Sequence, residues 1–400
     1  AAFNKGETSW EHVGVKAVDT HTLKLTLNGP TPHLPQLLLH FTWSPIPAHH
    51  VEANGGMFDR SSRWARPDNW VGNGAYVTEG HHLNNYLSVT PNPKYRRANE
   101  LKNKGIRFLP IVNGYTETRM YLGGKLHISN NVPPEMISYA AAKAPQDFCR
   151  DPYYCTIFYR LNTTKPPLDD VRVREALSLA IDRDALVHKV VRGAGTPTFC
   201  FTPPGANYRA EQPAEASLTQ TEREQRARQL LAEAGYAGGQ GFPTLELMTT
   251  SRDVQRIMAE TIQAMWAETL GIHVEIRACE WTAYKAAQQG MEYDISSSSW
   301  SGDYLDPATF VELWRSGGGN NCTGWGNTAF DADTAAAAAT GDAATRSKHL
   351  QQAEQRMLQE HPIIPLYHSE RTYLRSARHI RGRQPRLLDN FPLDAVEVVP

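Results

Sequence analysis

The sequence predicts an α/β protein that folds into two lobes, and three observations support this prediction. The chain has 400 residues, of which 40% are hydrophobic and 21% are charged, so it can bury more than one core. Its first part consists of short strand patterns separated by turns. Its second part alternates amphipathic helices with short apolar strands, as layered βα lobes do. No apolar run approaches the roughly 18 residues of a membrane span.

The first region is expected to contain strands that run in mixed directions. Residues 13–29, VGVKAVDTHTLKLTLNG, alternate apolar and polar side chains around a central Asp-Thr pair, which is typical of a hairpin. A Gly-rich turn then leads to strands within 76–80, 86–92 and 104–111. A helix that ends at the Gly123–Gly124 pair is followed by a strand entering Asn130 and Asn131.

The second region is expected to begin with a helix over 171–191. Asp169 and Asp170 stand in its N-cap and first-turn positions, and apolar residues recur along it at helical spacing. Gly235 is the natural C-cap of the next helix. The remaining expected elements are helices within 221–236, 252–271, around 334–340 and within 346–361, and strands within 244–251, 272–281 and 363–368.

Charge and motif content exclude several classes of protein. Lys plus Arg total 41 against 42 Asp plus Glu, so no overall positive field attracts nucleic acid, and no nucleic-acid-binding motif is present. The GxSxG and HExxH signatures are missing, and the GGK at Gly123 lacks the rest of a phosphate-binding loop. The pairs His49–His50 and His81–His82 do not converge on one metal with ordinary backbone geometry, so we predict neither a metal site nor a cofactor.

Two features bear on the cellular compartment. The opening AAFNKGETSW has no basic segment followed by an apolar one, so we expect a mature or truncated chain rather than one that carries a secretory signal. The chain has five cysteines, and Cys149 and Cys155 lie close together in CRDPYYC. They are expected either to form a local disulfide or to be buried free thiols.

The stretch SWSGDYLDPATF, residues 299–310, contains two carboxylates with different expected roles. Asp306 precedes a proline and a helical pattern, so it is interpreted as a turn or helix-capping residue. Asp303 follows a segment that should end a strand, where α/β proteins expose groups that contact ligands. No partner for acid–base catalysis can be named, so Asp303 is interpreted as a fixed anion that suits a cationic ligand group.

Several segments together resemble the extracytoplasmic peptide-binding components of ABC importers, the oligopeptide- and dipeptide-binding family 5. These segments are GNGAYVTEG, TPNPKYRRA, VRVREALSLAIDRDALV, LLAEAGY, CEWTAY, WSGDYLDP and HPIIPLYH, in the family's order. The resemblance runs from about Val13 to the C-terminus. It implies a type II periplasmic-binding-protein fold in which residues 1–155 and 369–400 form the first lobe and 156–368 the second. Hinges are expected near 149–161 and 367–375.

The resemblance also implies a ligand site and a function. Asp303 matches the aspartate that binds the α-ammonium of a peptide, with Ser301, Gly302 and Tyr304 beside it. Trp281 and Trp300 match aromatic walls of side-chain pockets, which the residues alone would have placed in the core. Asn130 and Asn131 match a segment that offers polar and main-chain contacts. The implied protein is a monomeric, non-enzymatic receptor in the periplasm, or a cell-surface lipoprotein, that passes peptides to an ABC permease in the inner membrane.

The sequence departs from the family in three ways. Basic residues that meet the peptide carboxylate are replaced by Gln255, Gln288 and Ser297, for which Arg252 is one possible substitute. The family half-cystine at Cys155 faces Ser301 in place of a second cysteine, which leaves Cys149 as the available partner. The long N-terminal segment that precedes VGVKAVD in the family has no counterpart, so the first lobe is expected to be partial.

Two alternatives to the peptide receptor stay open. One is a binder of another solute, such as nickel, haem or a sugar-like compound, within the same family. The other is a hydrolase that uses Asp303 and Asp306, with Asp294 as a third carboxylate, although no nucleophile and base pair is apparent.

Overall fold

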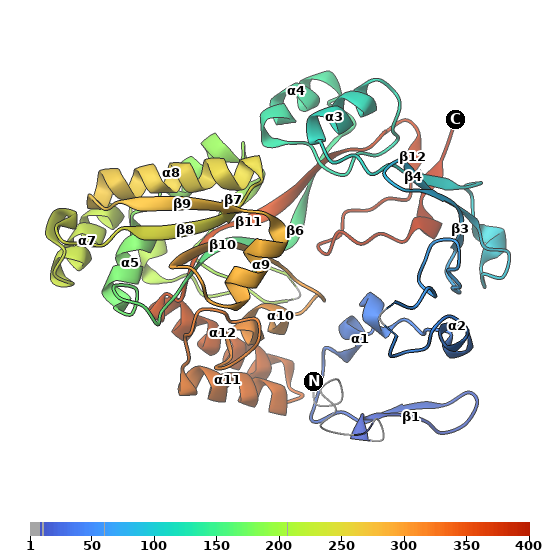
Figure 1. Cartoon of the computed structure of the whole chain (residues 1–400), viewed down its shortest axis with the longest axis horizontal. Coiled ribbons are helices and arrows are strands. Elements are labelled where there is room, and N and C mark those ends of the chain that lie inside the picture. The colour runs from blue at the N-terminus through green and yellow to red at the C-terminus, as the bar shows by residue number, and fades with distance from the viewer. Residues whose placement is uncertain (1–8, 10–11, 60, 206) are drawn as a thin grey trace.

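The computed structural model describes residues 9, 12–59, 61–205 and 207–400 and confirms the α/β class. Its main element is a six-stranded sheet in the order β7-β11-β6-β10-β8-β9, with β8, β9 and part of β10 parallel and the other pairs antiparallel (Figure 1). Its strands are β6 (Phe148–Leu161), β7 (Gly195–Pro197), β8 (Leu245–Thr250), β9 (Val274–Cys279), β10 (Ile295–Ser301) and β11 (Ile363–Leu374).

Helices cover both faces of this sheet because successive residues of a strand point to opposite sides. On β6, Tyr159 packs with α5, α7 and α8, whereas its neighbour Phe158 packs with α10, α11 and α12. Both rings are fully buried. The helices are α5 (Val171–Leu179), α7 (Gln220–Glu233), α8 (Asp253–Leu270), α9 (Trp281–Gln289), α10 (Ala308–Val311), α11 (Thr328–Ala339) and α12 (Ala343–Glu360).

The long strands β6 and β11 extend beyond the main sheet and carry the chain to a second group of elements (Figure 1). There Leu374 packs in a small core with Tyr121 and Ile137, from α3 (Gly114–Leu122) and α4 (Ile137–Lys143). The predicted hinge segments therefore coincide with two paired strands. Their register shifts on either side of Leu366 and Ser369, where β-bulges interrupt the ladder. The division into two moving lobes, with boundaries at 155/156 and 368/369, stays a prediction.

The front of the chain forms smaller units. The predicted hairpin over 13–29 is confirmed as β1 (Val15–Ala17) paired antiparallel with β2 (Leu23–Leu25). A three-stranded antiparallel sheet follows, in the order β3-β4-β5, and the chain closes on a two-stranded ribbon. These remaining elements are α1 (Leu34–Leu37), α2 (Ala48–Ala53), β3 (Tyr76–His82), β4 (Tyr86–Pro91), β5 (Ile106–Phe108), β12 (Ile380–Arg381) and β13 (Glu397–Val398).

Two expected elements differ from the structure. The helix over 171–191 breaks at 180–182, because Asp182 accepts a hydrogen bond from the Ala185 N–H and starts a new turn, α6 (Arg183–Ala185), which passes into a π-helix. The strand expected at Asn130 is reduced to a single bridge, between Ile128 and Arg375. Among the described helices, none combines the length and the apolar content needed to cross a bilayer.

The proposed disulfide between Cys149 and Cys155 is wrong in this structure. Both residues lie on β6 and both are free thiols. Six residues of extended strand separate their Cα atoms by about 20 Å, whereas a disulfide needs about 7 Å or less. Burial raises the pKa of the Cys155 thiol to about 11, so this group stays protonated at neutral pH.

A buried histidine gives a testable pH dependence of stability. Burial, reinforced by Arg174, lowers the pKa of His361 to about 3. In the unfolded chain the imidazole binds a proton near pH 6.5, whereas in the folded chain it stays neutral at that pH. The neutral, buried His361 therefore contributes its full stabilisation above about pH 6.5, and this contribution is lost as the pH falls. His361→Asn should keep the left-handed backbone of this position, where φ is 48°.

We expect the parent to lose about 2 kcal/mol more unfolding free energy than His361→Asn between pH 7 and pH 5. Denaturant titrations at both pH values measure this difference. The buried His368 titrates equally in both proteins and cancels from the comparison. Equal losses in the two proteins would contradict the assignment.

Candidate functional site

The candidate site is built on β10, in which four serines precede Trp300 and Ser301. The strand pairs with β6 along its whole length, and its first two residues also pair with β8. The chain leaves the sheet directly after Ser301, so Asp303 follows a strand end as predicted. Gly302 is confined there, because a Cβ at this position would lie 2.5 Å from the Tyr154 ring.

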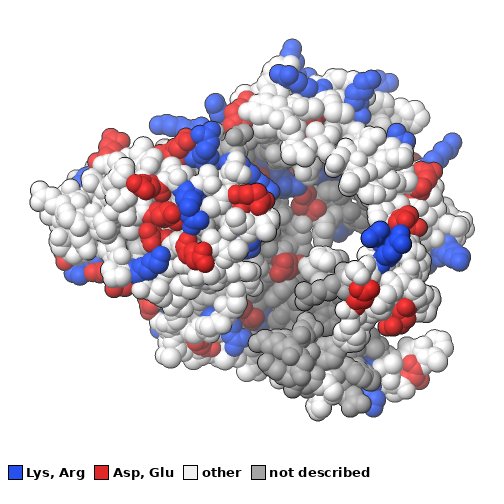
Figure 2. Space-filling view, in the orientation of Figure 1, with Lys and Arg blue, Asp and Glu red and all other residues white. Residues whose placement is uncertain are grey.

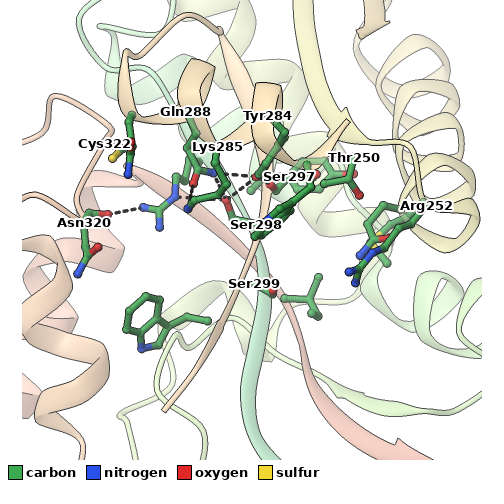
Figure 3. A pocket seen from close by; sticks show the side chains of 18 of the residues that line it. Thr250, Arg252, Tyr284, Lys285, Gln288, Ser297, Ser298, Ser299, Asn320 and Cys322 are labelled. Carbon is green, nitrogen blue, oxygen red and sulfur yellow. Dashed lines mark hydrogen bonds between the residues drawn. The ribbon is translucent and has the colours of Figure 1, made fainter. Parts of the chain in front are cut away.

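A pocket of about 320 Å³ opens beside β10 and α9 (Figure 3). Its wall combines aromatic side chains with amides, hydroxyls and three cations. The lining residues used below are Arg160, Arg252, Trp281, Tyr284, Lys285, Gln288, Ser297, Ser298, Trp300 and Asn320.

A polar network fixes the base of this pocket. The Gln288 amide donates to the Tyr284 hydroxyl at 2.8 Å and to the Ser298 hydroxyl at 2.9 Å. Its carbonyl oxygen accepts a hydrogen bond from Lys285 at 3.0 Å. The Tyr284 hydroxyl also donates to the main-chain carbonyl of Ser297. Because Gln288 and Tyr284 are both buried, these bonds hold the Lys285 ammonium in one place.

Arg160 supplies a second cation beside Lys285. Its guanidinium donates to the Ser298 hydroxyl at 3.2 Å and to the carbonyls of Asn320 and Asn321 at 3.1 and 2.7 Å. It also lies over the ring of Trp314, with 4.9 Å between the guanidinium carbon and the ring centroid. Arg160 is only 5% exposed and forms no ion pair with any described carboxylate. Burial accordingly lowers its pKa.

Arg252 supplies the third cation, from the start of α8. Figure 3 shows it at the opposite end of the pocket from Lys285, with Ser297 and Ser298 between them. Arg252 is exposed, whereas Lys285 is half-buried. Burial and the neighbouring Arg160 lower the pKa of Lys285. The substitution by Arg252 that the sequence suggested is thus accompanied by two further cations.

Both predicted tryptophans line this pocket, whereas the residues alone would have placed them in the core. Trp281 is 57% exposed at the first position of α9, where it stacks on Tyr284 with 5.8 Å between ring centroids. Trp300 is half-buried, with one side against the core beneath α10. Arg160 and Lys285 were missed. Lys285 could have been found, because it lies three residues before Gln288 on one face of the expected helix, but nothing in the sequence marks Arg160.

The structure places the other predicted residues outside the pocket. Asp303 is exposed, and its carboxylate forms no ion pair or hydrogen bond with a described residue. Its main-chain N–H donates to the Thr309 hydroxyl at 3.2 Å. Tyr304 stacks on His33 of the front segment, with 5.5 Å between ring centroids. Asp303 is therefore a free fixed anion three residues beyond Trp300.

Ser301 and Asn130 lie beside different parts of β6 and β11. Ser301 lies directly opposite Cys155 in the sheet, as the family's pairing implies. Arg371 lies over the Tyr153 ring and donates to the Asn130 side-chain oxygen at 3.2 Å. The main-chain N–H groups of Asn130 and Asn131 are both occupied by Glu117. These N–H groups are therefore not free for a ligand, whereas no described residue donates to the main-chain carbonyls of the two asparagines.

Asp306 has the structural role that the sequence predicted. It accepts a hydrogen bond from the Ala308 N–H at 2.9 Å, and Arg346 of α12 donates to both of its carboxylate oxygens at 2.7 and 3.0 Å. Asp294 accepts from the Glu246 N–H and pairs with Lys165. Two of the three carboxylates of the hydrolase alternative are thus committed to structural contacts. Among the described residues, no group of three or more His, Cys, Asp or Glu is arranged to hold a metal.

Comparison with known proteins finds relatives along the whole chain. The family described as bacterial extracellular solute-binding proteins, family 5 Middle, matches residues 3–322. The periplasmic oligopeptide-binding protein OppA of Escherichia coli K12 is 31% identical over 366 residues, which are 91% of this chain and 66% of that protein. The chain therefore spans about two thirds of the length of this relative.

Solved structures show the same fold. The Escherichia coli murein tripeptide-binding protein MppA superposes with a TM-score of 0.87 at 30% identity, covering 100% of this chain and 77% of that one. Haemophilus influenzae OppA in complex with the peptide RPPGFSPFR superposes with a TM-score of 0.86 at 27% identity, covering 99% and 77%. The type II binding-protein fold expected from the sequence is thereby confirmed.

Proposed function

Because the chain belongs to the family 5 bacterial extracellular solute-binding proteins, we propose that it captures peptides outside the cytoplasm and delivers them to the membrane permease of an ABC importer. Relatives at about 30% identity are peptide-binding proteins named as periplasmic. The periplasm is the proposed compartment. The monomer is the proposed form.

One observation carries this proposal: Asp303 is an exposed carboxylate without a described ion-pair partner, two residues beyond the strand of which residues 297–300 line the pocket. A free α-ammonium is the matching group on a peptide. Its burial against Asp303 would replace lost hydration with a charge-assisted hydrogen bond. Nickel, haem and sugars offer no such ammonium, so the same observation favours peptides among the possible cargoes.

The proposed functional step is closure of two lobes about β6 and β11. Both strands cross between the main sheet and the core of α3 and α4, so the backbone can bend there without breaking either core. The surface between the two parts is hollowed on the face shown in Figure 2, and charges of both signs are interspersed around it. A ligand that contacts both parts would favour the closed arrangement.

Native mass spectrometry tests the proposal. Protein purified without denaturation from cells grown on peptide-rich medium should carry additional masses, which acid release and sequencing should identify as peptides. On prolonged incubation the masses should stay unchanged, because the proposed receptor performs no hydrolysis. Release of shortened peptides by the parent, abolished in Asp303→Asn, would instead support the hydrolase alternative.

A further inference from the structure

We propose that the pocket between β10 and α9 binds a carboxylate of the ligand, held by Lys285 and Arg160, with Arg252 completing the basic lining at the other end. This inference rests on the proposed function and adds the chemistry of the ligand's second contact point. The residues proposed to contact the carboxylate differ from those that the family resemblance implied. Gln288 and Ser297 stand at the implied basic positions, and the cations come from neighbouring positions instead.

The first argument is an uncompensated buried charge. Arg160 is 5% exposed, and its Nη2 group donates to no described residue. All of its acceptors are neutral oxygens. A guanidinium held away from water is costly unless an anion is near. A ligand carboxylate that enters the pocket would provide this anion and could accept hydrogen bonds from the Nη2 group.

The second argument is the sign of the whole lining. Three cations and no carboxylate are found among the described residues that line the pocket. Lys285 contributes an ammonium whose only described acceptor is the neutral Gln288 oxygen. Burial first, and then the like charge of Arg160, lower the pKa of Lys285, so the two cations destabilise one another in the pocket. Binding of an anion would relieve this repulsion.

The third argument is position along β10. Ser298, which touches both Gln288 and Arg160, precedes Asp303 by five residues. Five residues of strand span up to about 17 Å. A short peptide that lies along this strand therefore reaches the anion with its ammonium and the cations with a carboxylate. That carboxylate is either the C-terminal group or an acidic side chain.

The test uses alanine peptides of two to five residues that carry one Glu, the same peptides with Gln in place of Glu, and the C-terminal amides of both. Calorimetry on the full-length protein should show that loss of one of these carboxylates weakens binding about ten-fold or more, because a charge-assisted hydrogen bond is lost. Sensitivity to Gln assigns the pocket to an acidic side chain. Sensitivity to amidation assigns it to the C-terminus.

Lys285→Gln should abolish the preference for carboxylate-bearing peptides, whereas Lys189→Gln, which changes an exposed lysine outside the pocket, should leave that preference and the affinity for Gln-amide peptides unchanged. Equal affinities of the parent for all four peptide classes would overturn the inference while leaving the proposed peptide function intact.

A second readout needs no peptide. N-acetylglutamate in excess, which has carboxylates and no ammonium, should slow reductive methylation of Lys285, but not of Lys189, as measured by mass spectrometry. Protection without any peptide binding would support the carboxylate pocket and contradict the proposed function. Absence of both protection and carboxylate preference would overturn the inference.

Discussion

Replacing Arg346 with glutamine is expected to lower the free energy of unfolding by about 3 to 5 kcal/mol. Arg346 forms a bidentate pair with Asp306, and both side chains are nearly buried, at 9% and 12% exposure. The substitution leaves the Asp306 carboxylate buried without its counter-charge. It also removes the donor to His33, at 3.1 Å, which is a direct contact between the front segment and the second part of the chain.

The matched control is Arg356→Gln on the same helix. Arg356 also pairs with an aspartate, Asp333, at 2.8 Å, but its side chain is 47% exposed. An exposed pair of this kind contributes about 1 kcal/mol or less. Denaturant unfolding of the parent and both variants measures the two costs. Similar losses for the two arginines would show that burial of the Asp306 pair does not determine its contribution.

Asp306 shows how far the sequence alone could predict this site. The proline after it and the helical pattern that follows were sufficient to predict a turn residue. Its partner is 40 positions away, and no local pattern connects an arginine in an amphipathic helix with a particular carboxylate. The structural role was therefore predictable, and the strength of that role was not.

The pocket shows the same limit from the functional side. Only the family resemblance predicted that Trp281 and Trp300 line the pocket, because an isolated tryptophan is more often buried in a core. The cations were missed because the resemblance directed attention to Gln255, Gln288 and Ser297, which are neutral. In this chain the positive charges lie instead on Lys285, one helical turn from Gln288, and on Arg160 of the adjacent strand. That these cations line the same pocket becomes apparent only when the pairing of the strands is known.

Regular elements were predicted well where periodicity and caps agreed. α7 has a full capping box between Thr219 and Glu222, and α8 ends at Gly271 with φ of 69°, so both follow closely from the sequence. The prediction of a disulfide between Cys149 and Cys155 was wrong for the opposite reason. CRDPYYC contains a proline and reads as a loop, but its residues are held extended by pairing with β11, more than 200 positions later. Tertiary pairing overrode the local signal.

Asp303→Asn is expected to weaken the binding of free-amine peptides by about thirty-fold or more, which is the second large effect. The carboxylate has no described partner of its own, so its removal should leave the fold unchanged. In the bound state it would pair with a desolvated ammonium. Truncating one partner of such a pair costs about 2 to 5 kcal/mol, because the other is left buried and unpaired.

Titration calorimetry on the full-length protein measures this effect against two comparisons. N-acetylated peptides, which lack the ammonium, should bind the parent about as weakly as free peptides bind Asp303→Asn, and acetylation should cost the variant little more. Asp184→Asn removes an exposed carboxylate from α6, outside the pocket, and should bind free peptides like the parent. This pattern would mean that Asp303 and the ammonium act on each other rather than separately. Equal affinity of the parent for acetylated and free peptides, with no loss in Asp303→Asn, would reduce Asp303 to an ordinary loop residue and would leave the basic pocket as the main source of ligand recognition.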